Sequence, residues 1–201
     1  MRRSNRPIAE RFNHLLTVMS SQRFLKMQGI GNEVPFFIFS FKPSDTFEMK
    51  QLEANLLTHL SLKGVRVLKI DLYDLSIEML KERGIWEQVL EIEPTVEKSQ
   101  LLELFEGVLD PKDNLVPAIA AKMAEQPYDI LLVTGIGEVY PYIRTHNLLE
   151  NLQSTAKNAP TVFFFPGSYT PSLEKGFMLN LFDLPSGNNY YRAFDIEHFE
   201  V

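Results

Sequence analysis

The residues best suited to chemistry lie in one short turn that follows the apolar stretch 129–134. Two glycines end this stretch, and behind them come a carboxylate, two tyrosines, a guanidinium, an imidazole and a carboxamide. Arg144, His146 and Asn147 lie on the first turns of a helix predicted over 142–157, where amides and dipole favour an anion. The turn is therefore our candidate surface for a ligand or a partner, formed by Gly135, Gly137, Glu138, Tyr140, Tyr142, Arg144, His146 and Asn147.

Two interpretations of this turn remain open. Gly135 and Gly137 supply two of the three glycines of a dinucleotide-binding G-x-G-x-x-G motif, but tyrosine and proline follow, so the motif is incomplete. Glycines at this place also allow the chain to turn sharply off a buried strand. Glu138 and Arg144 are six residues apart, which is not the spacing of a helical ion pair. The polar groups fit either a small anionic ligand or contacts with neighbouring loops and a partner protein.

Other patterns typical of enzymes and metal sites are missing from the sequence. It has no cysteine, which excludes disulfides and thiolate chemistry. The histidines are far apart and none has a metal-ligand spacing, and the nucleophile motif G-x-S-x-G does not occur. The first predicted strand-to-helix turn, KPSDT, has no glycine and contains a proline and an aspartate, so it is unsuited to wrapping a phosphate. We expect no metal and no cofactor, and we assign no catalytic residue.

A second aromatic and basic group, NNYYRAFDI, stands near the C-terminus. Stacked rings beside an arginine can bind a base, and they can also contact a protein. Packing of the same rings against the core as an edge strand is the simpler interpretation. We add Tyr191 and Arg192 to the candidate surface.

The net charge of −6 is unevenly distributed. Residues 1–30 hold five Arg and one Lys against one Glu, whereas residues 71–110 hold eleven Asp and Glu against three Lys and Arg. Phosphate contacts need a coherent basic surface, so contact with DNA through the N-terminal arm and NYYRAF is an alternative only, indirect or weak. No stretch has the length of a membrane span, and no apolar signal core follows the N-terminal arginines. We expect a cytoplasmic protein without membrane contact.

The first half of the chain predicts a parallel crossover. Residues 8–19 have the apolar periodicity of a helix, and FFIFSF at 36–41 is short and aromatic, as in a buried strand. A second helix begins at about Thr46, where Asp45 and Glu48 have the spacing of a capping box, and Gly64 stands where a C-cap glycine belongs. The strand at 65–72 completes a strand, helix and strand unit, which is parallel and right-handed.

The second half predicts the rest of an α/β fold. Residues 73–126 show no strand pattern and form a helical crossover or cap. Strands at 129–135 and 161–167 flank a helix over 142–157, and two C-terminal stretches can pair as an antiparallel edge hairpin. We predict one three-layer domain over 1–201 with a mostly parallel central sheet, a helical insertion and a flexible basic tail at 1–6. Ligands of such sheets bind beyond the carboxyl ends of the strands, where the turn 135–147 lies.

Several of these segments resemble the BrxB family of the bacterial BREX phage-defence systems. The resemblance runs from about Arg11 to Phe199, and its most specific segments are GNEVPFFI, TGIGEVYPYIR and NYYRAF. It implies a place in a multiprotein assembly that blocks phage replication and marks host DNA by methylation. Other members of such systems include a methyltransferase, a phosphatase-like protein called PglZ and a large ATPase. The resemblance brings no catalytic residues with it.

Residues and resemblance together predict a non-catalytic assembly or adaptor component. It binds another BREX protein, with PglZ as the expected partner, through the surface around Gly135–Asn147. The alternative from a different class is a small anion- or nucleotide-binding enzyme with its site at the strand ends. Glu138, Arg144 and His146 would then be its polar groups.

Overall fold

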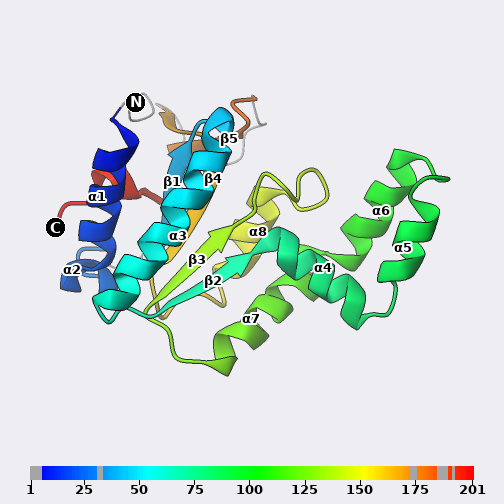
Figure 1. The fold of residues 1–201 in the computed structure, drawn as a ribbon, viewed down its shortest axis with the longest axis horizontal. Helices are drawn as coiled ribbons and strands as arrows, with labels where there is room; N and C mark the ends of the chain where they lie inside the picture. The colour runs from blue at the N-terminus through cyan, green and yellow to red at the C-terminus, as the bar shows by residue number, and fades with distance from the viewer. Residues whose placement is uncertain (1–5, 31–33, 173–175, 185–189, 192) are drawn as a thin grey trace.

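The structure, a computed structural model, describes residues 6–30, 34–172, 176–184, 190–191 and 193–201. Helical segments and strands alternate from β1 to β4 (Figure 1). In chain order they are α1 (Ile8–Met19), α2 (Gln22–Leu25), β1 (Phe36–Phe41), α3 (Thr46–Leu62), β2 (Val67–Asp71), α4 (Leu72–Glu82), α5 (Trp86–Ile92), α6 (Lys98–Val108), α7 (Val116–Glu125), β3 (Ile130–Thr134), α8 (Thr145–Leu152), β4 (Thr161–Ser172), β5 (Gly176–Leu181), β6 (Tyr190–Tyr191) and β7 (Phe194–Asp195). Short helical turns at Pro43–Asp45, Pro111–Leu115 and Ile196–His198 complete the set.

The central sheet has the strand order β2-β3-β4-β1-β7, and every neighbouring pair in this series is parallel. The predicted α/β fold with a mostly parallel sheet is therefore confirmed. Beyond the parallel part, β4 continues and pairs with β5 in antiparallel fashion, and β5 pairs with β6. The expected antiparallel hairpin is thus present, and among the described residues of the last segment Tyr190–Tyr191 belong to it. Phe194–Asp195 instead join β1 in parallel.

Helices cover both faces of the sheet, which makes three layers (Figure 1). Side chains of a strand point alternately to opposite faces, so β1 contributes to two separate cores. Phe36 and Ile38 pack with residues of α4, α7 and α8, whereas Phe37 and Phe39 pack with residues of α1, α2 and α3. The run FFIFSF is buried at every position because both of its faces are covered.

The path of the chain explains why the helices divide between the two faces. After β1 the chain crosses to the far edge of the sheet at β2, and it then returns through β3 to β4. A right-handed crossover places its helix on one face when the chain moves one way and on the other face when it moves back. Accordingly α3 packs on one face, and α4, α7 and α8 pack on the other.

The fully described segment between β2 and β3 consists of helices joined by turns and contains no strand, as expected. Asp71 and Asp110 cap its first helix and its Pro111–Leu115 turn by accepting hydrogen bonds from backbone amides. The hairpin of α5 and α6 projects from the end of the molecule that lies far from α1 (Figure 1). In α5 only Val89 is buried, and in α6 no residue is buried.

A buried ion pair ties the first helix to the C-terminus. The Arg11 Nε atom lies 2.8 Å from Oε1 of Glu197, and both side chains are almost completely buried. Arg11 also donates a hydrogen bond to the carbonyl oxygen of Ser40 in β1, and its guanidinium lies 4.3 Å from the centre of the Phe39 ring. These contacts join α1, β1 and the last helical turn.

Candidate functional site

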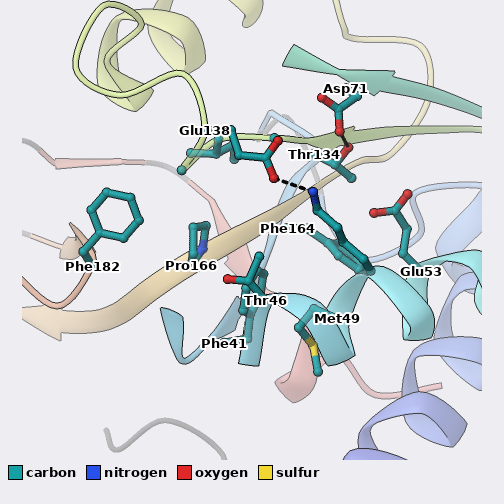
Figure 2. A pocket seen from close by; sticks show the side chains of 14 residues that line it. Phe41, Thr46, Met49, Glu53, Asp71, Thr134, Glu138, Phe164, Pro166 and Phe182 are labelled. Atoms are coloured by element: carbon teal, nitrogen blue, oxygen red, sulfur yellow. Dashed lines mark hydrogen bonds and ion pairs between the residues drawn. The ribbon is translucent and has the colours of Figure 1, made fainter. Parts of the chain in front are cut away.

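A small cavity of about 180 Å³ opens at the carboxyl edge of the parallel strands. It lies between the start of α3, which leaves on one face of the sheet, and the loop from β3 to α8, which leaves on the other. Such a crevice is where open parallel sheets bind ligands. One part of its wall is apolar, formed by Phe41, Met49, Phe164, Pro166 and Phe182, as Figure 2 shows.

The polar part of the wall is acidic. The Nζ atom of Lys50 lies 2.7 Å from Oε1 of Glu138 in an ion pair that joins α3 to the loop after β3 (Figure 2). Glu53 lies one helical turn after Lys50 and pairs with Lys69 of β2. Asp71 is held at the end of β2, because its Oδ1 accepts from the amides of α4 and its Oδ2 accepts from the Thr134 hydroxyl at 2.9 Å.

Charge decides what this cavity can hold. The hydrogen bond to Glu138 and the negative charges of Glu138, Asp71 and Glu53 raise the pKa of Lys50 above its usual value, although partial burial opposes them. Three carboxylates thus lie near Lys50, and one of them, Glu53, is also paired with Lys69, which leaves a net negative charge. A phosphate or another anion would meet net repulsion here, whereas a cationic group would be attracted. Among the described residues no cluster of three or more His, Asp or Glu could hold a metal ion.

Position 135, which lines the cavity, requires a glycine. Its φ is +75°, in the left-handed region that other residues rarely adopt. A Cβ atom at this position would lie 2.6 Å from Oδ1 of Asp71 and 3.1 Å from the amide nitrogen of Leu72. The glycine therefore lets the chain turn against the carboxylate that caps α4.

The structure divides the predicted surface around Gly135–Asn147 into separate parts. Gly135, Gly137 and Glu138 line the cavity. Tyr140 is 48% exposed, and its ring meets the Phe182 ring edge-on at a centroid distance of 6.1 Å. Tyr142 points elsewhere, because its half-buried ring packs against Phe105 of α6 at 5.2 Å.

The remaining predicted residues do not line the cavity. Arg144 is exposed at the N-terminus of α8, where its side chain makes no capping hydrogen bond, and His146 and Asn147 are partly buried in the first turn of α8. An anion-binding enzyme would need Glu138, Arg144 and His146 together at its site. Of these three residues only Glu138 lines the cavity. The side chain of Tyr191 and the whole of Arg192 lie outside the described residues.

The sequence prediction missed the polar wall that α3 and β2 contribute, formed by Lys50, Glu53 and Asp71. Lys50 and Glu53 stand between the apolar positions of a helix, where polar residues normally face solvent. The usable signal was Asp71, since a carboxylate at the end of a buried parallel strand lies at the ligand-binding edge.

His146 should make the protein less stable in mild acid. Burial and the neighbouring Arg144 lower the pKa of its imidazole, and Glu150 opposes them only in part. The unfolded chain, with a histidine pKa of about 6.5, then binds more protons than the folded chain, so stability falls as the pH drops below this value. We expect His146→Gln to lose less stability than the parent between pH 7.5 and 5.5 in urea unfolding. Equal losses in the two proteins would contradict this expectation.

Comparison with known proteins places the chain in a family. The family model described as "BREX protein BrxB" matches residues 68–196. A BREX protein BrxB of Bacillus cereus (strain H3081.97) is 33% identical over 197 residues, which cover 95% of this chain and 98% of the relative. A BREX protein BrxB of Escherichia coli O9:H4 (strain HS) is 31% identical over 189 residues, covering 94% of this chain and 91% of the relative.

No solved structure matches the chain. Among the described residues, no helix has the length and apolar character that crossing a membrane requires. The two relatives match almost end to end, and the family model spans more than half of the chain. The chain therefore belongs to the BrxB family of BREX proteins.

Proposed function

We propose that this chain is a non-catalytic assembly component of a BREX phage-defence system. It contacts another BREX protein, with PglZ as the proposed partner, through the surface around Gly135–Asn147. The observation that carries this proposal is the exposure of Tyr140 and Arg144 on one turn. Tyrosine and arginine supply much of the binding energy at protein interfaces, and the half-exposed ring of Tyr140 is available to a partner.

The turn is also held in place, as a recognition surface should be. Gly135 lets the start of the turn pack against Asp71, and the Lys50–Glu138 ion pair connects the same loop to α3. Val139 and Ile143 are buried in the core on either side of the exposed tyrosine. A turn that keeps one shape in the free protein loses little entropy on binding.

An anion-binding enzyme is less well supported. The cavity at the strand ends carries an excess of carboxylates, and Arg144 and His146 do not line it. The turn from β1 to α3 holds Pro43 in a short helical turn and contains no glycine, so it offers no cradle of amides for a phosphate.

A double variant, Tyr140→Ala with Arg144→Ala, tests the proposed surface. We expect it to fold normally but to lose co-purification with PglZ from cells that express the whole BREX system, by about tenfold or more. Tyr142 is unsuitable for this test, because it packs against Phe105 and its removal would disturb the fold. The matched control is Leu62→Ala with Lys63→Ala, an exposed apolar and cationic pair at the far end of α3.

The outcomes separate the parts of the proposal. Loss of PglZ from the double variant alone supports both the surface and the partner. If another BREX protein is lost instead, the surface stands and PglZ is the wrong partner. If the double variant keeps every partner and full phage defence, the surface is not where this protein binds.

A further inference from the structure

A second hollow lies away from the strand ends, in the helical segment between β2 and β3. It is a groove of about 310 Å³ between α4 on one side and α5 and α6 on the other, and Tyr142 also lines it. Its lining is mainly apolar and includes Tyr73, Leu80, Trp86, Leu90, Leu101 and Phe105. Two of the helices that line it, α5 and α6, project away from the sheet (Figure 1).

The helices that form this groove leave much of their apolar surface uncovered. Tyr73 and Leu90 are each 43% exposed. Leu101 and Phe105 of α6 are only partly buried. Apolar surface gathered in a groove, in contrast to single exposed residues, indicates a contact site for another molecule.

The α5–α6 segment beside the groove is strongly acidic, and its Glu93 lines the groove. The segment 86–108 contains one lysine, Lys98, and six exposed glutamates: Glu87, Glu91, Glu93, Glu97, Glu103 and Glu106. None of the six forms an ion pair with a described residue. Lys81 of α4 lies 5.8 Å from the centre of the Trp86 ring, so the face of this ring already attracts a cation.

We propose that this groove docks a basic amphipathic helix of another protein. The apolar stripe of that helix would enter between α4 and the α5–α6 hairpin, and its lysines and arginines would face the acidic α5–α6 segment, of which Glu93 lines the groove. This is the helix-in-groove mode of recognition, in which spaced apolar anchors give affinity and complementary charge gives orientation. The inference does not depend on the surface around Gly135–Asn147, and it gives the protein a second contact face.

Trp86 makes the proposal directly measurable, because it is the only tryptophan in the chain. The probe is a helical peptide of roughly 18 residues, five turns, with leucines along one face and lysines on the other. We expect it to shift the Trp86 emission to shorter wavelength as the ring loses contact with water. A scrambled peptide of the same composition and a leucine–glutamate peptide of the same pattern should leave the emission unchanged.

Two variants locate the binding. Leu90→Lys places a charge on the apolar lining, and Glu93→Lys reverses the charge of an exposed glutamate of the lining and leaves the packing intact. We expect each to weaken binding of the leucine–lysine peptide by about tenfold or more. Leu62→Lys, on an 80% exposed residue of α3 outside the groove, should bind as the parent does.

Several results would overturn the proposal. The proposal is wrong if the leucine–lysine peptide leaves the emission of Trp86 unchanged, or if the scrambled or acidic peptide binds equally well. It is also wrong if Leu62→Lys weakens binding as much as Glu93→Lys does. A concentration-dependent dimer that Leu90→Lys dissociates would show that a second copy of the chain covers the groove, and this too would overturn it.

Discussion

Replacing Arg11 with methionine should lower the free energy of unfolding by about 3–5 kcal/mol. Methionine fills a similar volume but leaves the carboxylate of Glu197 buried without its partner, and Glu197 is only 8% exposed. The same change removes the hydrogen bond to the Ser40 carbonyl oxygen and the contact with the Phe39 ring. A buried charge without a partner costs more than the loss of an exposed ion pair.

Urea unfolding of three variants separates the ion pair from simple loss of packing. Arg23→Met is the matched control, because Arg23 also faces an aromatic ring, Phe199 at 5.8 Å, but is exposed. It should cost less than about 1 kcal/mol. The double variant Arg11→Met, Glu197→Gln should be more stable than Arg11→Met alone, since no buried carboxylate then lacks its counter-charge. A double variant less stable than the single one would refute this account.

The Arg11–Glu197 pair also shows where sequence reasoning stops. The two residues are 186 positions apart, and the sequence around either one does not indicate that they pair. The helix over Ile8–Met19 could be predicted from its apolar period, but an arginine within it is normally a solvent-facing residue. Only the parallel addition of β7 beside β1 brings the last turn of the chain onto the first helix.

The strands were predictable for a simple physical reason. Strands covered on both faces are apolar at nearly every position, so FFIFSF and ILLVT stand out from the amphipathic helices around them. The strand order could not be read in this way, because buried strands carry no sign of their neighbours. The C-terminal stretch shows the same limit, since one run of aromatic residues divides between β6 and β7.

The capping box expected at Asp45 is wrong, and the cause is local. Pro43 begins a short helical turn, and Asp45 already has φ −92° and ψ 7° within it. A capping residue needs an extended backbone to direct its side chain at the amides ahead. The Asp45 carboxylate instead accepts a hydrogen bond from the Ser44 hydroxyl. Asp71 does have the extended backbone, and it caps α4.

The candidate site was predictable only in part, for a related reason. The turn 135–147 could be located because it follows a buried strand, but sequence does not show which way its side chains point. Tyr140 and Tyr142 are two residues apart, yet one meets Phe182 and the other meets Phe105. The cavity and the groove therefore lie on different sides of the same turn.

Gly135→Ala should have the second large effect, a loss of about 2–3 kcal/mol in the free energy of unfolding. A residue with a Cβ atom pays about 1–2 kcal/mol to adopt the left-handed backbone found at Gly135. The new methyl group would also push Asp71 away from the amides of α4, and losing a cap of this kind costs about 1 kcal/mol. Co-purification with a BREX partner should weaken too, because the loop that carries Tyr140 starts here.

Gly107→Ala is the matched control for this change. Gly107 lies within α6, and nothing would come within 4 Å of an added Cβ atom. The substitution should raise the free energy of unfolding by up to about 1 kcal/mol, since alanine favours a helix more than glycine does. In a double-mutant cycle, Gly135→Ala should cost less in an Asp71→Ala background than in the parent, because the methyl group then meets no carboxylate. Equal costs in the two backgrounds would show that the backbone conformation alone, and not the contact with Asp71, requires a glycine at this turn.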